Sequence, residues 1–534
     1  MQAMPGERFD VCVIGSGAAG GVLASQLVKR GARVALIEAG KYRDPSELRT
    51  HAWPYDQGTP PAVPSVTPDL KREPIAYEGD PIFVSRGRVL GGRTTHWNGV
   101  ALRFSEDDFR EWSVNGIEED WPLAYRDLAP YYDQAEDLMV VCGTRENLEV
   151  LPDGRFIRPL RLRCSENILD KACRKIGMRV IPVRKALATE PGHGRAPCHY
   201  CGHCMEGCRA SAIFNTAEHV IPEARGAGGL VIRSGWMVRE LRTDDEARVT
   251  SAAIFHRDSR EEGEIKADVF VACCGNVESV RLLLNSRSRR FPNGLANNND
   301  VVGRYLHGHI TAEVHGYLED LVGKKPTNQD GALDHAYIPR SQTPQGADYA
   351  GGFGIQLNVR GYMRPHHARH VPGFGRDFKK RVRDLQPAHT DALAFGKVIG
   401  HAGNRIALHP DRRDDYGLPL PQVHFRWQPN DRAMYRAMLE ACHAIYDTAG
   451  VALRVEQPGP NGFASHEVGC VRMGKDPKTS VLNELNQAHE IKNLFVVDGS
   501  SFTTFPEKNP TLTIVALAIR AAENIQRMRG RGEL

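Results

Sequence analysis

Residues 10–38 have the sequence DVCVIGSGAAGGVLASQLVKRGARVALIE, and the rest of the chain is organised around them. An apolar run ends at Gly15, and the turn that follows has the spacing G-x-G-x-x-G, formed by Gly15, Gly17 and Gly20. The first glycine permits a tight turn, the second lets the backbone approach a pyrophosphate, and the third lets helix and strand pack closely. The pattern predicts a strand, a turn and a helix that bind an adenine dinucleotide.

The segments after the glycines support the same prediction. Apolar residues recur at helical intervals, and the N-terminus of such a helix offers N–H groups to phosphates. A second apolar run ends at Glu38, about 20 residues after the turn, where an acid can bind a ribose. A glycine turn that serves packing alone is the weaker alternative. The stretch does not distinguish FAD from NAD.

Length and composition limit the class of protein. A chain of 534 residues is too long for one ordinary core, so we expect two or more domains. With 41% hydrophobic and 25% charged residues and a mean hydropathy of −0.41, the composition is that of a soluble globular protein. A net charge of +4 over this length gives no reason to expect nucleic acid. No apolar run approaches the ~20 residues of a membrane span.

The N-terminus bears on localisation. The first predicted strand begins by Phe9, which leaves no room for a signal peptide. We therefore expect a cytoplasmic protein. Export to the periplasm together with a partner that carries its own signal is the alternative.

Four of the twelve cysteines are clustered. Cys198, Cys201, Cys204 and Cys208 have the spacing C-x2-C-x2-C-x3-C, which is that of bacterial iron–sulfur loops without the proline that usually follows. Thiolates at this density also suit zinc. An iron–sulfur cluster is the preferred interpretation, zinc is the second, and a disulfide or free thiols are the third. The other cysteines lie singly in apolar segments, as buried small residues do.

A second glycine-rich segment is RGRVLGGRTTHWNGVALRF, residues 86–104. It resembles the flavin-proximal loop of the glucose–methanol–choline (GMC) oxidoreductases, in the G-G-x-x-T-H-W form of pyranose oxidase and bacterial sugar dehydrogenases. In pyranose oxidase the histidine of this motif bonds covalently to the flavin, and the matching residue here is His96. The alternative is that His96 only packs on the isoalloxazine ring or hydrogen-bonds to it.

The C-terminal region continues the resemblance. It contains H-x-x-G-x-x-R-M-G, then N-L-x-V-x-D-G-S, then N-P-T-L-T, as the GMC family does. The resemblance implies that His466 and Asn509 are the catalytic pair. Histidine suits the removal of a hydroxyl proton near neutral pH, and an amide can donate a hydrogen bond to the same oxygen. A purely structural His466 is the alternative.

The same segments indicate which residues contact the cofactor. Pro510 at the start of a helix places a positive helix end where it can stabilise a reduced flavin. The predicted FAD-binding residues are Gly15, Gly17, Gly20, Glu38, Arg88, Gly91, Gly92, Thr95, His96, Asn98, Gly275, Asp498, Gly499, Asn509, Pro510 and Thr511.

The resemblance implies an α/β architecture, with a Rossmann-like FAD domain and a mainly antiparallel substrate domain. We expect the FAD domain at 1–310, including a proline-rich loop at 53–74, a helical cover and the cysteine-rich insertion at about 195–210. The substrate domain is expected at 311–460, because its segments alternate as antiparallel strands do. Residues 461–534 then return to the FAD domain.

The leading functional interpretation is an FAD-dependent sugar dehydrogenase that oxidises a secondary hydroxyl to a ketone. Electrons would pass through a cluster at the four cysteines to an external acceptor, a cytochrome subunit or a quinone, and a small partner subunit is possible. The first alternative is an oxygen-using oxidase with a structural or zinc-bound cysteine loop. The second is a non-catalytic electron-transfer module, which would need no base such as His466.

Overall fold

The computed structural model describes residues 8–48, 70–325, 336–341, 343, 346–359, 363, 365–463 and 465–534. Most of the predicted proline-rich loop 53–74 lies outside these residues. Within the described part, none of the helices is both long and apolar enough to cross a membrane.

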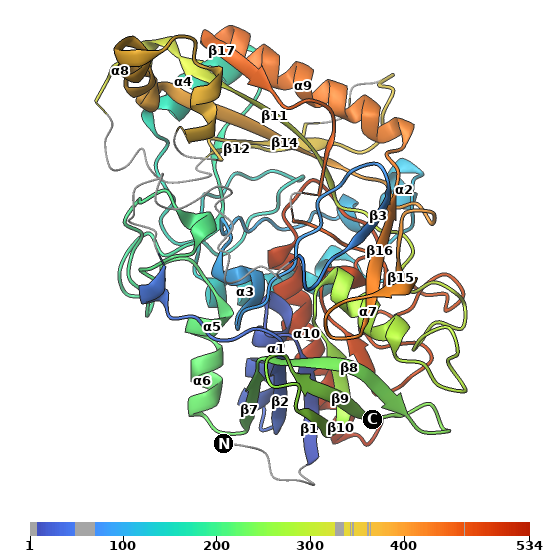
Figure 1. Ribbon diagram of the computed structural model, residues 1–534. Coiled ribbons are helices and arrows are strands. Elements are labelled where there is room, and N and C mark those ends of the chain that lie inside the picture. The colour runs from blue at the N-terminus through green and yellow to red at the C-terminus, as the bar shows by residue number, and fades with distance from the viewer. Residues whose placement is uncertain are drawn as a thin grey trace.

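The first sheet has seven strands and forms the lower half of the molecule in Figure 1. Its order is β7-β2-β1-β10-β9-β8, and β19 pairs with β10. The bounds are β1 Arg8–Ile14, β2 Val34–Glu38, β7 Leu230–Ser234, β8 Trp236–Thr243, β9 Val249–His256, β10 Glu262–Ala272 and β19 Leu494–Val496. The central pairs are parallel, whereas β8, β9 and β10 are antiparallel. Buried parallel strands explain the continuous apolar runs of the sequence.

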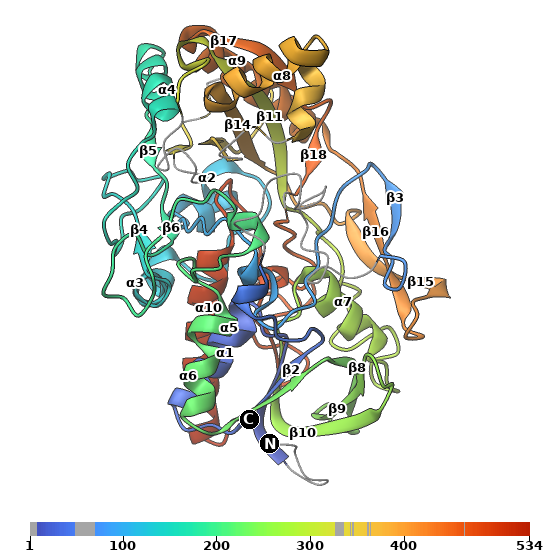
Figure 2. The same cartoon turned by 60° about the vertical axis from the view of Figure 1, so that its left-hand side comes forward.

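Helices from both ends of the chain cover this sheet. Helix α1 (Ala18–Lys29) packs against α10 (Thr511–Gly530), and α10 packs against α3 (Tyr125–Met139). Figure 2 shows α1 and α10 side by side. Almost every apolar side chain of α10 is buried. The C-terminal segment is therefore built into the core of the nucleotide domain.

The second sheet forms the upper half of the molecule and is antiparallel. Its order is β17-β11-β14-β13-β12-β5, and β18 pairs with β11. The bounds are β5 Ile181–Pro182, β11 His309–Leu318, β12 Ala336–Ile338, β13 Phe353–Leu357, β14 His389–Lys397, β17 Val451–Glu456 and β18 Asn461–Gly462. Helix α9 (Pro429–Ala449) packs on β11 and β14, and α4 (Cys164–Lys175) packs on α9. The predicted fold class, a Rossmann-like sheet with a second, antiparallel one, is confirmed.

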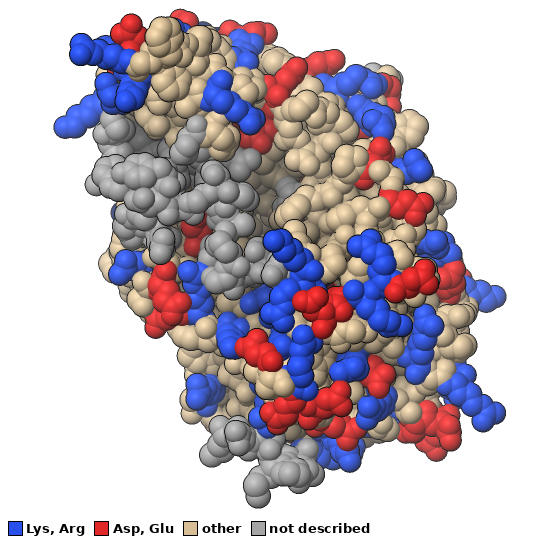
Figure 3. All heavy atoms as spheres, viewed as in Figure 1, with Lys and Arg blue, Asp and Glu red and all other residues tan. Residues whose placement is uncertain are grey.

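Smaller elements connect the two sheets. β3 (Ala76–Gly79) pairs in parallel with β16 (Pro419–Phe425), which pairs with β15 (Arg405–Arg413). β4 (Val141–Cys142) pairs with β6 (Lys185–Ala186). The remaining helices are α2 Glu111–Asn115, α5 Thr216–His219, α6 Ile221–Gly226, α7 Asn276–Asn285 and α8 Gly375–Leu385. On the face shown in Figure 3, basic and acidic side chains interleave over the lower half.

Candidate active site

The glycine turn after β1 leaves no room for side chains at two positions. Gly15 has φ +98°, and a Cβ there would lie 2.4 Å from the carbonyl oxygen of Cys273 at the end of β10. A Cβ on Gly20 would lie 1.9 Å from the carbonyl oxygen of Gly15. At Gly17 the nearest atom to such a Cβ is the Gly92 Cα, 3.9 Å away. A side chain at Gly15 or Gly20 would therefore clash with backbone, whereas a Cβ at Gly17 would make only an ordinary contact with Gly92.

Glu38 lies beside this turn and is almost fully buried, at 6% exposed. Its carboxylate accepts hydrogen bonds from the Ser16 amide at 3.1 Å, the Ser16 hydroxyl at 2.7 Å and the Gly40 amide at 2.7 Å. Burial raises the pKa of Glu38, and these donors oppose the rise. The Ser16 hydroxyl also accepts from the Gly91 amide at 2.9 Å. Ser16, which sequence reasoning did not select, thus joins the two glycine-rich segments, while the ribose contact of Glu38 stays a prediction.

The second glycine-rich segment forms a single 3-10 turn, Gly92–Thr95, that starts from a left-handed Gly91. The Thr95 hydroxyl donates to the Gly92 carbonyl at 2.9 Å and lies 3.0 Å from Nδ1 of His96. Burial lowers the pKa of His96 to about 4, with help from Arg93 and Arg43, so its imidazole is neutral. His96 lines one pocket together with Cys208. Asn98 follows on the same loop and is half-buried.

Arg88, predicted to contact the cofactor, is held in buried ion pairs. Its guanidinium lies 2.8 Å from Glu73 and 2.8 Å from Glu278 of α7. Burial would lower the pKa of Arg88, but the two carboxylates raise it above its ordinary value. Arg88 therefore anchors the loop to α7, and its contact with a cofactor stays a prediction.

Asp498 joins the end of β19 to the N-terminus of α7. One carboxylate oxygen accepts from the Gly275 amide at 3.0 Å and from the Ser279 hydroxyl at 2.6 Å. The other accepts from the Ser500 amide at 2.8 Å and its hydroxyl at 2.5 Å. The carbonyl of Gly499 accepts from the Gly469 amide at 3.0 Å, which ties this turn to the segment that follows His466.

His466 and Asn509 meet although they are 43 residues apart. Nδ2 of Asn509 lies 3.4 Å from Nε2 of His466. His466 precedes a segment that pairs with residue His307, and Asn509 directly precedes Pro510, the N-cap of α10, with Thr511 its first residue. The prediction that these side chains lie together agrees with this distance.

Two residues that sequence reasoning missed contact the pair. Nδ1 of His309, at the start of β11, lies 2.9 Å from Nδ1 of His466. The amide of Gln356 in β13 donates to Oδ1 of Asn509 at 2.8 Å. His309 stood within VVGRYLHGH, a segment resembling the GMC pattern, whereas Gln356 carried no signal in the sequence.

Arg93 connects the cofactor loop to the catalytic segment. It donates to the carbonyl of Ser465 at 2.7 Å and to the carboxylate of Glu467 at 2.8 Å, on either side of His466. Burial, His309 and Arg93 together hold the pKa of His466 well below its ordinary value. His466 is therefore a neutral imidazole and a proton acceptor at neutral pH.

A buried ion cluster holds the segment in front of Asn509. Nζ of Lys508 lies 2.5 Å from Asp108 and 3.2 Å from Glu507. Arg340 lies 3.0 Å from Asp108 and 3.2 Å from Glu507. Burial would raise the pKa of Asp108, but Lys508 and Arg340 hold it well below its ordinary value. The cluster fixes the backbone that carries Asn509.

Replacing Lys508 by methionine should lower the free energy of unfolding by about 3 kcal/mol, because it leaves buried carboxylates short of a cation. The matched control is Lys380→Met, which removes an exposed pair with Asp384 at 2.6 Å and should cost below about 0.5 kcal/mol. Thermal and urea unfolding of both variants measure the difference. Equal losses in the two variants would contradict a stabilising role for the buried cluster.

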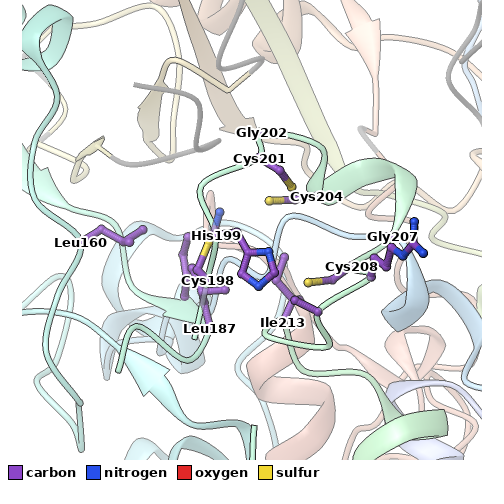
Figure 4. A pocket seen from close by; sticks show the side chains of 13 residues that line it. Leu160, Leu187, Cys198, His199, Cys201, Gly202, Cys204, Gly207, Cys208 and Ile213 are labelled. Carbon is purple, nitrogen blue, oxygen red and sulfur yellow. The ribbon is translucent and has the colours of Figure 1, made fainter. Parts of the chain in front are cut away.

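The four clustered cysteines line one pocket in the loop between β6 and α5 (Figure 4). The sulfur atoms of Cys201 and Cys204 point toward each other, whereas Cys198 and Cys208 approach from other sides. Backbone amides donate to the sulfur of Cys198 and to that of Cys208, each at 3.3 Å. Burial raises the pKa of Cys198 to about 11 and that of Cys204 to about 12.

The predicted metal centre gains no support from this pocket. The thiols are the right chemistry for iron or zinc. Within the described residues, however, no three cysteine, histidine, aspartate or glutamate side chains converge on a position for a metal ion. As arranged, the residues do not fit a bound cluster, and the iron–sulfur and zinc interpretations stay predictions without a geometric basis.

Comparison with known families covers both the glycine-rich segments and the segment that carries His466 and Asn509. A family model described as GMC oxidoreductase matches residues 9–311, and a second with the same description matches residues 401–518. The chain belongs to the GMC oxidoreductase family. The two matches contain the glycine turn, the His96 loop, His466 and Asn509.

Relatives of this GMC oxidoreductase include two dehydrogenases. The chain is 29% identical to 2-methyl-1,2-propanediol dehydrogenase of Mycolicibacterium austroafricanum, over 98% of this chain and 96% of the relative. It is 27% identical to the fructose dehydrogenase large subunit of Gluconobacter japonicus, over 97% of each. The crystal structure of pyridoxine 4-oxidase from Mesorbium loti shares the fold, with a TM-score of 0.67, 19% identity and coverage of 97% and 99%. The protein is an FAD-dependent GMC oxidoreductase that acts on CH–OH groups.

The residues of this GMC oxidoreductase fit FAD. A Cβ at Gly275, whose φ is +79°, would meet no atom within 4 Å, and a Cβ at Gly17 would meet only the Cα of Gly92, at 3.9 Å. Both glycines sit at helix N-termini, whose free N–H groups suit phosphates. When bound, FAD supplies the hydride acceptor. The protein then has to orient the substrate and accept the hydroxyl proton.

Proposed function

We propose that this enzyme oxidises a secondary hydroxyl of a sugar or glycoside to a ketone and passes the electrons to an external acceptor. The observation that carries the proposal is the pair of His466 and Asn509, a neutral buried base 3.4 Å from an amide donor. Fructose and gluconate dehydrogenases among the relatives support a sugar substrate. A relative that is named as a large subunit supports a small partner subunit.

Each side chain of the pair has one task. Nδ2 of Asn509 donates a hydrogen bond to the substrate hydroxyl oxygen, and Nε2 of His466 accepts its proton. Gln356 holds Oδ1 of Asn509, so the amide nitrogen is the atom that faces His466. The two hydrogen bonds hold the carbinol C–H bond of the substrate in one orientation, which lowers the entropic part of the barrier. An electron-transfer module needs no such buried base.

The experiment is anaerobic mixing of the FAD-loaded enzyme with a panel of sugars, glycosides, diols and aliphatic alcohols, followed by flavin absorbance. NMR of the product identifies the oxidised carbon. Rapid reduction by a sugar with formation of a keto-sugar supports the proposal. Reduction by aliphatic alcohols alone would overturn the sugar assignment, and reduction by none of them would overturn the proposed function.

An oxygen-using oxidase is the second candidate. The cysteine pocket favours it, because its sulfur atoms do not converge on a metal and we derive no electron path through them. Reoxidation rates with oxygen, quinones and cytochrome c separate the two candidates. Iron, sulfide and zinc analysis of the pure protein tests the cysteine pocket, and stoichiometric iron with sulfide would restore the cluster interpretation.

The rate of flavin reduction should stay level as the pH falls through about 6.5, the ordinary pKa of histidine. The reason is that burial, His309 and Arg93 lower the pKa of His466, so the proton-accepting neutral form persists to lower pH. Stopped-flow reduction between about pH 5 and 8 measures this profile. A decline centred near 6.5 would show that His466 titrates as an exposed histidine does.

A further inference from the structure

His309 uses both of its ring nitrogens in a fully buried position. Its exposed fraction is 0%, and its ring stacks on Phe505 with centroids 4.3 Å apart. Nε2 lies 2.8 Å from the carbonyl oxygen of Pro506, and Nδ1 lies 2.9 Å from Nδ1 of His466. A carbonyl oxygen can only accept, so Nε2 of His309 carries a hydrogen and donates it.

The contact with Pro506 also determines which nitrogen of His466 carries the hydrogen. Burial lowers the pKa of His309 to about 3, so its imidazole is neutral and holds a single hydrogen. That hydrogen is on Nε2, so Nδ1 of His309 is an acceptor. Nδ1 of His466 must then be the donor in the 2.9 Å contact. In neutral His466 the lone pair is consequently on Nε2, the nitrogen that faces Asn509.

We infer that His309 is a positioning residue, which selects the tautomer of His466 and so makes Nε2 the atom that accepts the substrate proton. The inference rests on the proposed role of His466 as the base. Histidine is a switchable donor and acceptor, and which nitrogen carries the hydrogen is set by the partner of the other nitrogen. Here the carbonyl of Pro506 determines the tautomer of His309, and His309 determines the tautomer of His466.

The same contact persists in the protonated form. When Nε2 of His466 accepts a proton, its ring becomes a cation that still donates from Nδ1 to His309. A hydrogen bond from a charged donor is stronger than one from a neutral donor. The other charged and titratable groups that influence the two rings are Arg93, near His466, and His307, near His309. Burial, His309 and Arg93 still keep the pKa of His466 well below its ordinary value.

Two substitutions separate the functions of the two His309 nitrogens. In His309→Asn, the amide oxygen falls near the place of Nδ1 and can accept from His466. In His309→Gln, the amide nitrogen falls near the place of Nε2 and can donate to Pro506, but no acceptor faces His466. The two side chains have similar polarity. If His309 had a purely structural role, we would therefore not expect flavin reduction to be slower in His309→Gln than in His309→Asn.

We expect His309→Gln to reduce flavin about 10²-fold more slowly than the parent enzyme, and His309→Asn to stay within about tenfold of it. Flavin content and thermal stability of both holoenzymes show whether each variant folds. Nitrogen-15 NMR of histidine-labelled holoenzyme provides a readout besides activity. The His466 signals, identified by their loss in His466→Gln, should show a protonated Nδ1 and an unprotonated Nε2 in the parent enzyme.

The outcomes distinguish this inference from the proposed function. An unprotonated Nδ1 of His466 in the parent enzyme overturns the inference, even if a variant fails to fold. Equal reduction rates for His309→Gln and His309→Asn also overturn it, provided that His466→Ala abolishes reduction. If His466→Ala still reduces flavin normally, the proposed function fails, whereas the NMR result still decides the tautomer.

Discussion

Replacing His466 by alanine should lower the rate of flavin reduction by substrate about 10³-fold while FAD remains bound. A positioned general base contributes roughly 10²- to 10⁴-fold to a rate. Here the base is neutral, lies 3.4 Å from Asn509 and is fixed from behind by His309. The glycine turn and the Gly91–Thr95 segment, which we expect to bind FAD, are not changed by this substitution. Stopped-flow reduction and the flavin-to-protein ratio are the measurements.

The control for this substitution is a histidine on the surface. His443 of α9 is 37% exposed at its side chain and lies 3.1 Å from Glu456, so His443→Ala should leave both quantities unchanged. A His466→Ala protein that reduces flavin at the parent rate would refute the role of the base. Loss of flavin from His466→Ala would instead assign His466 to cofactor binding.

Replacing Gly20 by alanine should abolish FAD binding and destabilise the nucleotide domain. The added Cβ would lie 1.9 Å from the carbonyl oxygen of Gly15 and 3.0 Å from the Cβ of Cys273. The first of these neighbours is backbone, so the turn has to move instead of a flexible side chain. Overpacking of this kind costs about 1–3 kcal/mol or more. The shift also displaces the N–H groups at the start of α1 from the phosphates.

A second helical glycine provides the matched control. A Cβ on Gly530, at the end of α10, would meet no atom within 4 Å, so Gly530→Ala should bind FAD as the parent protein does. The flavin-to-protein ratio after purification and the melting temperature compare the two variants. A Gly20→Ala protein with full flavin content would show that the third glycine is not needed for the close packing of helix and strand.

The sequence was most informative where a local backbone conformation can be formed by only a few residue types. The glycine spacing at 15–20 predicted the turn, because a tight phosphate turn requires positive φ and close backbone contact. Continuous apolar runs predicted the strands on either side of the first helix, and their burial in a parallel sheet accounts for those runs. The motifs around His466 and Asn509 likewise predicted a pair that the structure brings to 3.4 Å.

Sequence reasoning was weaker where a role depends on distant partners. The cysteine spacing predicted a metal centre, but spacing does not specify where the sulfur atoms point, and in the described part of the chain they do not converge. From its polar neighbours in the sequence alone, His367 would be placed in a solvated loop, yet it is 2% exposed and stacks on His389 with centroids 4.5 Å apart. Packing against the second sheet accounts for the difference.

Residues 10–38 were sufficient to predict the strand, the glycine turn and the helix that follows, since these elements make their contacts with one another over a short stretch. The proton chemistry needed the folded molecule. His309, Gln356, His466 and Asn509 come from four separate segments, and a hydrogen bond between side chains is short and directional. Such a contact exists only after the sheets and the C-terminal segment have packed, so no local pattern could place the proton on Nδ1 of His466.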